Sequence, residues 1–398
     1  MIDMLWLWGE MLVRWLHVIA GIAWIGSSFY FIALDLSLKP GKGLPDEAHG
    51  QAWQVHGGGF YNMVKYLVAP ARMPAELTWF KWEAYATWLS GAVLMVLVYY
   101  LGAELYLVDY NRLDAQPWQG VAISVAGIGL GWALYDGLCR SPLGNDDRLL
   151  ALAGLCLLTL LAYGYSLLFS DRGAFMQMGV TIGTIMVANV LMVIIPGQKK
   201  VVASLLAGEQ PDPRHGRRGK QRSLHNNYLT LPVVYVMLGG HYPMLYATDH
   251  AWLMFALVLV IGAVIRQYFN TKHRGEPAPL WYWGVAGLLM VVVIWLGFAG
   301  APQQHQQQAM PADGEHGLDA AAVELVQERC ALCHAAEPAW DGMAIAPKGV
   351  RLETEAEIIA QARQIAAQAA WSRAMPPAGV MELSSDERLL LRRWAERL

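Results

Sequence analysis

Apolar residues run through most of the chain in long blocks that are separated by short polar segments. Eight of these blocks are long enough to cross a hydrocarbon layer of about 30 Å, which takes roughly 20 helical residues. They cover residues 11–36, 79–101, 118–138, 148–169, 175–196, 229–248, 251–270 and 279–299. The pattern predicts an all-α protein in which residues 1–299 form a polytopic bundle of eight transmembrane helices.

The sixth block is the weakest of the eight because Gly239, Gly240 and Pro243 interrupt it. Such breaks are tolerated in a membrane where neighbouring helices or a cavity satisfy the freed backbone groups. We therefore expect this segment to span the membrane as an irregular helix.

Composition agrees with a membrane protein. Of the 398 residues, 56% are hydrophobic and only 15% are charged, and 17 are tryptophan. These values are too apolar for a soluble globular chain of this length. Cys139 and Cys156 lie in or beside apolar blocks, so we expect inert packing cysteines and no disulfide framework.

The hydropathy pattern changes near residue 299. Residues 300–317 are polar and rich in glutamine, which predicts a flexible linker that cannot form a core. A linker of this length spans on the order of 25 Å root-mean-square. Residues 318–398 are then predicted to form a small soluble domain that ends in a short helix, 385–398.

Basic residues in the connecting segments predict the orientation. With the N-terminus outside, the outer loops carry only Arg112 and Arg172. The inner loops carry fourteen basic residues: Lys39, Lys42, Lys65, Arg72, Arg140, Lys199, Lys200, Arg214, Arg217, Arg218, Lys220, Arg222, Lys272 and Arg274. This asymmetry predicts a multi-pass protein of the bacterial inner membrane, with both the N-terminus and the C-terminal domain in the periplasm. Asp3 and Glu10 near the start argue against a cleaved signal peptide.

The C-terminal segment contains Cys330-Ala331-Leu332-Cys333-His334, the spacing used for covalent attachment of haem c. The two thiols can form thioethers with the two vinyl groups of one porphyrin, and His334 then supplies the proximal iron ligand. Met375, which precedes two prolines, is the preferred distal ligand over Met343 and Met381. With the closing helix, these features resemble a class I cytochrome c domain.

Ionisable residues inside the membrane are costly, and we treat them as candidates for functional sites. His17 and His241 fall at a similar depth on the outer side and could share a haem b or a substrate. His56 and His225 belong to the inner side and form a second candidate pair. The alternative for each histidine is a structural role, in which the imidazole bonds a backbone carbonyl at a helix contact.

The segment 57–88 combines three glycines, several aromatic residues and both signs of charge. Lys65 and Arg72 supply positive charge, and Glu83 enters the second helix. A positive-inside loop with an aromatic belt explains Arg72 and the tryptophans, but it explains Glu83 less well. A second polar cluster, His225 to Tyr228, opens the sixth helix and has an N-cap as its alternative interpretation.

Several stretches together resemble the membrane-bound, cytochrome-c-linked urate oxidases. They are the run from His56 to Trp88, the segment Asn226 to Pro232 followed by His241-Tyr242-Pro243, and the terminal haem motif. The resemblance covers essentially the whole chain. It implies oxidation of urate to 5-hydroxyisourate, a step of purine degradation, with oxygen drawn from water. Gly240 stands where this family pattern would lead us to expect a polar residue.

The resemblance also implies an electron path. Electrons would pass to haem c and then to a respiratory acceptor, such as a soluble cytochrome c or a terminal oxidase. Since the reaction releases two electrons and one haem c accepts one at a time, we hypothesise a haem b held by His17 and His241, with His56 and His225 as a second site. Stepwise release of a urate radical to haem c is the alternative.

Urate is a planar anion, so its pocket should offer aromatic surfaces, amide groups and positive charge. Residues of these types are Arg14, Lys65, Arg72, Trp82, Tyr85, Asn226 and Asn227. A general base must also accept a proton, and Glu83, His17 and His241 are the candidates. The catalytic prediction therefore comprises Glu83, His17, His241, Lys65 and Arg72.

Two other classes of protein fit a helical bundle tethered to a cytochrome. One is a quinol dehydrogenase or an accessory subunit of a terminal oxidase, and the other is a transporter or sensor without chemistry of its own. The sequence has no G-x-G-x-x-G or P-loop pattern, which argues weakly against nucleotide cofactors. We expect membrane lipid but no nucleic acid among its partners, and homo-oligomerisation stays open.

Overall fold

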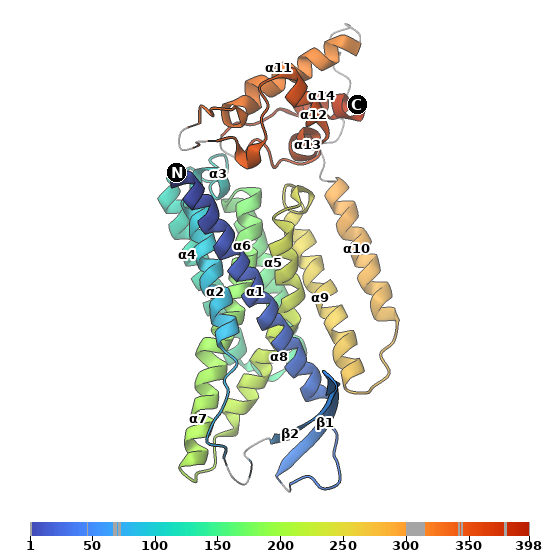
Figure 1. Ribbon diagram of the computed structural model, residues 1–398. Helices are drawn as coiled ribbons and strands as arrows, with labels where there is room; N and C mark the ends of the chain where they lie inside the picture. The colour runs from blue at the N-terminus through green and yellow to red at the C-terminus, as the bar shows by residue number, and fades with distance from the viewer. Residues whose placement is uncertain are drawn as a thin grey trace.

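A long helical bundle carries a smaller helical unit at one end in the computed structural model (Figure 1). The structure describes residues 2–45, 47–66, 70, 73–299, 315–340, 343, 345–377 and 380–397. The N-terminal end of the first helix lies at the same end of the bundle as the C-terminal unit, and a β-hairpin lies at the opposite end (Figure 1). This arrangement agrees with the predicted topology, whereas the membrane side that each end faces stays a prediction.

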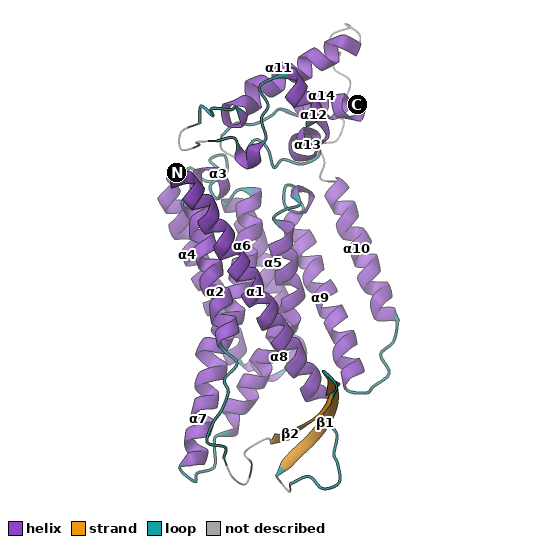
Figure 2. Cartoon of the chain, in the orientation of Figure 1, coloured by secondary structure: helices purple, strands orange, loops and turns teal. Residues whose placement is uncertain are grey.

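Helices dominate the described residues (Figure 2). The helices of the bundle and its connections are α1 Ile2–Ser37, α2 Trp82–Leu94, α3 Ala103–Tyr106, α4 Pro117–Arg140, α5 Asp147–Leu168, α6 Asp171–Ala188, α7 Ile195–Leu206, α8 Pro213–Gly239, α9 Ala251–His273 and α10 Trp281–Ala299. Short 3₁₀ turns cover η2 Pro142–Asn145 and η4 Pro243–Leu245, and π-helical turns cover η1 Met95–Tyr100 and η3 Asn189–Ile194.

Six helices of the described chain are long and apolar enough to cross a membrane. They are Leu5–Ser37, Pro117–Arg140, Asp147–Leu168, Asp171–Leu206, Ala251–His273 and Trp281–Ala299. The other two predicted spans are helical as well, at α2 with η1 and in the second half of α8, but they are less apolar or begin in a polar stretch. The chain is therefore a membrane protein by length and composition of its helices, and the count of eight crossings stays a prediction.

The bundle core lies where α4, α5, α6, α8 and α9 meet. Buried aromatic and aliphatic residues there include Tyr165, Phe175, Ile182 and Phe255, of which Ile182 is fully buried. The outward faces instead expose large apolar side chains, such as Leu288 on α10, which is 66% exposed. Apolar residues on both the inside and the outside are what a helix needs when its outer surface contacts lipid.

The all-α prediction missed one element, a β-hairpin. Strands β1 Ala48–His56 and β2 Gly59–Tyr66 pair antiparallel, with His56 opposite Gly59. Gly57 and Gly58 between them both have positive φ, +58° and +81°. Such a two-residue turn matches the twist of the flanking strands and favours glycine at both positions. The three glycines of the predicted loop therefore close a hairpin.

Two bundle helices are interrupted by π-helical turns. η1 Met95–Tyr100 follows α2, and η3 Asn189–Ile194 lies between α6 and α7. A π-helical turn inserts an extra residue into a helix and is frequent at functional sites. Here the turns carry Tyr99 and Asn189, both of which are buried polar residues in contact with arginines of other helices.

The C-terminal unit has a core of its own. It consists of α11 Glu315–His334, η5 Pro347–Gly349, α12 Glu355–Ala360, α13 Ala362–Ile365, the π-helical η6 Ala366–Ala370 and α14 Ser385–Arg397. Val326, Ile358, Leu391 and Trp394 are almost fully buried in this core. Helix α11 begins slightly before the predicted domain boundary at 318, and residues 300–314 of the predicted linker lie outside the described residues.

A network of polar side chains crosses the interior of the bundle between α4, η3 and α8. Arg222 donates to Asp136 at 2.7 Å and to Asn189 at 3.1 Å. Asn189 in turn donates to Tyr135 at 3.0 Å and to Asn226 at 2.9 Å. Such a satisfied network costs little in a low-dielectric interior, but the loss of one member leaves other polar groups unpaired.

Two arginines contact the same carboxylate in this network, and we predict that substituting them lowers stability by different amounts. The Arg222 side chain is 4% exposed, whereas that of Arg140, which also contacts Asp136, is 63% exposed. Replacing Arg222 with methionine should destabilise the protein by about 3 kcal/mol, because it breaks a buried pair. Arg140→Met should cost less than about 1 kcal/mol. Equilibrium unfolding in detergent measures both, and equal losses would contradict the argument.

Candidate functional site

The residues of the haem motif lie at the end of α11. His334 is the last residue of this helix, and its Nδ1 lies 2.9 Å from the carbonyl oxygen of Val350. A bond from Nδ1–H to a carbonyl fixes the tautomer and leaves Nε2 free to bind iron, as is usual for ligand histidines. This geometry fits the role of proximal ligand.

The surroundings of the two thiols also fit a porphyrin. Cys330 and Met375 both pack against the apolar core of the C-terminal unit. Burial raises the pKa of the Cys330 thiol to about 11. Near the same core, the indole Nε1 of Trp394 is buried without an acceptor in the described residues, and such a donor would suit a haem propionate. The donor set and its apolar lining therefore fit haem c.

Met375 is better placed than the other two candidate distal ligands. It contacts the same apolar core as Cys330, whereas Met343 and Met381 are absent from that group of contacts. In the described ranges, no group of three or more His, Cys, Asp and Glu side chains is arranged to hold a metal ion. That finding does not bear on an iron held by one histidine and one methionine.

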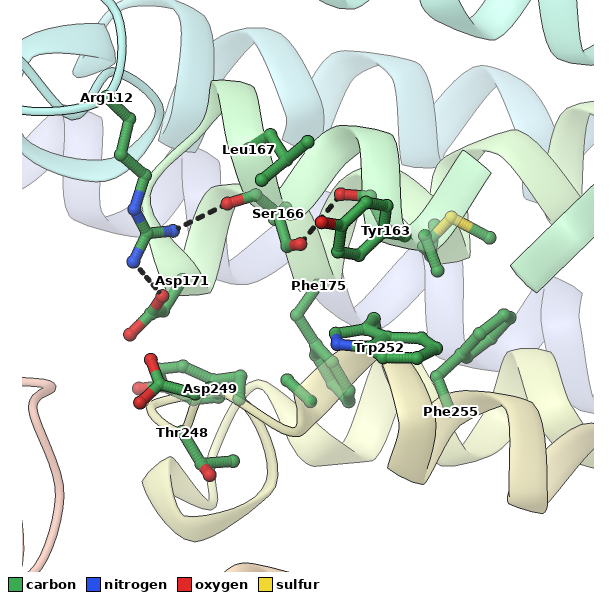
Figure 3. Close-up of a pocket in the computed structure, with 15 residues that line it drawn as sticks. Arg112, Tyr163, Ser166, Leu167, Asp171, Phe175, Thr248, Asp249, Trp252 and Phe255 are labelled. Atoms are coloured by element: carbon green, nitrogen blue, oxygen red, sulfur yellow. Dashed lines mark hydrogen bonds and ion pairs between the residues drawn. The ribbon is translucent and has the colours of Figure 1, made fainter. Parts of the chain in front are cut away.

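A pocket of about 330 Å³ is lined by Arg112 and by residues of α5, α6, α9 and the loop before α9. This size is near the lower limit for small-molecule pockets, about 300–1,000 Å³. Tyr163, Phe175, Trp252 and Phe255 supply aromatic walls, as Figure 3 shows. Charged groups, among them Arg112, lie at the opposite end of the pocket from Trp252 and Phe255 (Figure 3).

The charged end of this pocket is already neutralised within the chain. Arg112 donates to Asp171 at 2.6 Å and to the backbone oxygens of Ser166 and Phe169 at 3.0 and 2.9 Å. Its Nε lies 3.1 Å from Asp109. The guanidinium has few donors left for a ligand, so this pocket is poorly suited to bind an anion.

Residues of the C-terminal unit contact the same pocket end. Arg373 donates to Asp249 at 2.6 Å, and its Nε lies 3.9 Å from Asp171. The hydrogen bond from Arg373 is the largest cause of the lowered pKa of Asp249. The neighbouring Ala374 packs against the bundle core, and a third contact runs from Asn111 to Glu382 at 2.7 Å. The segment before Met375 therefore packs against the bundle.

The structure places the predicted outer histidines differently from each other. His17 lies between α1 and α2, and its Nδ1 is 2.9 Å from the carbonyl of Thr87 and 3.2 Å from the hydroxyl of Ser90. Gly91 makes room for the ring, because a Cβ there would lie 2.9 Å from the imidazole. His241 is exposed at the end of α8. No described contact joins the two, and a haem b between them stays a prediction.

His241 lies among cations of three other segments. Burial and the charges of Arg14, Lys348 and Arg172, in that order of effect, lower the pKa of its imidazole. The lowered pKa favours the neutral imidazole, which can accept a proton. Lys348 belongs to the C-terminal unit, so this imidazole lies close to the interface between the two parts of the chain.

The two histidines predicted for the inner side also lie in different environments. His56 is exposed at the hairpin turn, whereas His225 lies 2.7 Å from the hydroxyl of Tyr135 inside the polar network. Asn226 belongs to this network, and Asn227 accepts from Arg266 at 3.2 Å. No described contact joins His56 to His225, and a second haem there stays a prediction.

Of the remaining predicted catalytic residues, the structure describes Lys65 in β2 and Glu83 in α2. Lys65 forms an ion pair with Asp35 at the end of α1, so its charge is neutralised. Glu83 lies in the first turn of α2, where negative charge is favourable near the helix N-terminus. Arg72 lies outside the described residues. Their catalytic roles stay predictions.

Most charged residues at the end of the bundle that contacts the C-terminal unit were not predicted as site residues. Arg112 and Arg172 entered it only as two charges in the outer loops, and Asp171, Asp249 and Arg373 did not enter it as site residues. The available signal was the rarity of these two arginines, since a cation on the sparsely charged side of a membrane protein needs a reason. Their acidic neighbours are distant in sequence and could not be paired with them from the chain alone.

Comparison with known proteins gives one result. A family model described as urate oxidase N-terminal matches residues 3–297. No curated protein and no solved structure matches the chain. The matched range ends with α10, so it covers the bundle, its pocket and the four predicted ligand histidines of the bundle, and it excludes the C-terminal unit.

Proposed function

The chain belongs to the urate oxidase N-terminal family, and from this premise we propose that it oxidises urate to 5-hydroxyisourate and passes the electrons to haem c on its own C-terminal domain. The family match over residues 3–297 carries the proposal. The C-x-x-C-H motif at the end of α11 adds the electron acceptor. Haem c, when bound, accepts these electrons one at a time.

The proposed reaction balances without dioxygen. Urate and one water give 5-hydroxyisourate, two protons and two electrons. A C–O bond forms at C5 of the purine, and the oxygen comes from water. A base of the protein must take up a proton as water attacks. Of the three predicted bases, His241 is the one whose neutral form and position near the C-terminal domain suit this role.

The contacts between the two parts of the chain support a direct electron path. Ala374, next to the proposed distal ligand Met375, packs against the bundle core. Lys348 of the C-terminal unit also lies near enough to His241 for its charge to lower the pKa of that imidazole. The haem would thus be bound on a domain that rests on the catalytic bundle, and an acceptor such as a soluble cytochrome c or a terminal oxidase would then reoxidise it.

The proposed cellular setting follows from the membrane helices and the basic loops. We place the protein in the bacterial inner membrane with the C-terminal domain in the periplasm, because covalent haem attachment takes place there in bacteria. A reporter fused after the C-terminus tests this orientation. Activity of a reporter that works only in the cytosol would contradict it.

Urate-dependent reduction of haem c in the purified protein tests the function. Under anaerobic conditions, urate should reduce the haem, lose its ultraviolet absorbance and yield product that carries label from ¹⁸O water. No hydrogen peroxide should form when an acceptor is supplied. Reduction by a quinol but not by urate would contradict the proposal and favour a quinol dehydrogenase.

A further inference from the structure

The outer end of the bundle holds an arginine whose charge lacks a carboxylate partner in the described residues. Arg172, in the first turn of α6, stacks its guanidinium 4.8 Å from the ring centroid of Tyr106 and 5.8 Å from that of Tyr99. Its Nε is buried and has no hydrogen-bond partner in the described part of the chain.

The acidic residue next in sequence does not compensate this charge. Asp171 is engaged by Arg112 at 2.6 Å and faces Arg373 at 3.9 Å. Removing a cation from water without pairing it is costly, and cation–π contacts recover only part of that cost. A buried donor aimed at no acceptor, beside two aromatic rings, is the arrangement that an incoming anion would complete.

More positive charge gathers around the same place. Arg14 acts electrostatically on Tyr99 and on His241, and Arg172 acts on both as well. Lys348 of the C-terminal domain adds a further cation beside His241. Among the described residues, Glu10 is the acidic side chain that pairs with this group, through Arg14 one helical turn away. The sum of these charges is positive.

We propose that Arg172, together with Arg14 and His241, forms the binding site for a planar purine anion between the bundle and the C-terminal domain. The in-plane donors of the guanidinium match the carbonyl and ring-nitrogen edge of such an anion, as they match carboxylates. The tyrosines beside Arg172 supply aromatic surface. The aromatic pocket near Trp252 is the weaker alternative because the donors of Arg112 are already used.

This inference rests on the proposed function for the identity of the natural ligand, so its test separates binding from turnover. The probe is 8-azaxanthine, a planar purine analogue that is anionic at neutral pH, titrated by calorimetry into the purified haem-loaded protein. Arg172→Gln should weaken binding at least about tenfold, as loss of one charge-assisted bond predicts. His241→Gln and Arg14→Gln should weaken it less.

Arg217→Gln is the matched control. Arg217 is exposed on α8, on the other side of the predicted membrane, and its substitution removes the same charge without changing the site. The Arg217→Gln variant should bind 8-azaxanthine with the affinity of the parent. If Arg172→Gln does not fold, the His241 and Arg14 variants decide the question. Parent-like affinity in all folded variants, or no binding of 8-azaxanthine to the parent, would overturn the site.

The outcome also distinguishes the two hypotheses. If the probe binds and Arg172→Gln weakens it while urate leaves the haem oxidised, the site stands and the proposed oxidation of urate fails. If urate reduces the haem equally well in the parent and in the Arg172, Arg14 and His241 variants, the oxidation stands and the anion site is wrong.

Discussion

Replacing both Cys330 and Cys333 with serine should abolish urate-dependent respiration while leaving the bundle folded. In the proposed function, two thioethers would link the porphyrin to the chain, and haem c would carry the electron transfer that the polypeptide alone cannot perform. Both thiols lie on the C-terminal domain, whose apolar core is separate from that of the bundle. Haem staining after denaturing electrophoresis measures the loss of the covalent cofactor, and oxygen uptake with urate measures the loss of respiration.

Cys156→Ser provides the matched control for this experiment. Cys156 is an exposed free cysteine on α5, so its substitution removes a thiol without touching the haem motif. It should retain both the haem stain and the oxygen uptake. Unchanged urate-coupled respiration in the double variant would show that electrons leave the bundle by another route.

Substituting Met375 tests the distal ligand of the proposed haem without removing the covalent attachment. Because Met/His ligation raises the potential of a haem iron, Met375→Ala should lower the midpoint potential by on the order of 0.1–0.4 V within the total range of about 0.8 V that axial ligands span. The covalent stain should remain. A potential that changes with Met343 or Met381 instead would identify a different distal ligand.

The helices of the bundle could be predicted from the sequence because the bilayer imposes a simple length rule on apolar blocks. The hairpin could not be recognised in the same way, since its strands alternate weakly and several aromatic residues, such as Phe60, remain exposed. The available signal was Gly57-Gly58 between two short alternating runs. The charges and aromatic residues around those glycines instead favoured a positive-inside loop.

The site was harder to predict than the fold, for a physical reason. The haem motif is local, so five consecutive residues predict its chemistry. The contacts at the end of the bundle near the C-terminal unit instead join residues that are far apart in sequence, as Arg112 joins Asp171 and Arg373 joins Asp249. Hydropathy gives the depth of a residue but not its rotation around the helix axis. His17 and His241 therefore matched in predicted depth without being in contact.

Reversing the charge of Arg373 should slow the proposed electron transfer from urate to haem c, because it weakens the docking of the C-terminal domain on the bundle. In the parent, Arg373 lies between Asp249 and Asp171, with 34% of its side chain exposed. An exposed ion pair alone contributes less than about 1 kcal/mol, so Arg373→Gln should have a small effect. Arg373→Glu places like charges together, which costs several kcal/mol, and we expect at least about a tenfold lower rate.

The charge-swapped double variant distinguishes docking from general damage. Adding Asp249→Arg to Arg373→Glu restores an attractive pair at the same place, so the rate of haem reduction by urate should recover. Reduction by ascorbate and the midpoint potential should stay at parent values in every variant, because neither depends on docking. Arg363→Glu is the control, since Arg363 is exposed on the same domain and makes no described contact with the bundle. Stopped-flow spectroscopy gives the rates.

Salt provides a second, independent measure of the same contact. Screening by about 1 M salt shortens the Debye length to about 3 Å, so it should lower the parent rate and reduce the difference between parent and Arg373→Glu. The polar linker tethers the domain, so weakened docking lowers the docked fraction without losing the domain to solution. If the rate of haem reduction does not change with salt, with Arg373→Glu or with the charge-swapped double variant, electron transfer does not depend on docking through Arg373.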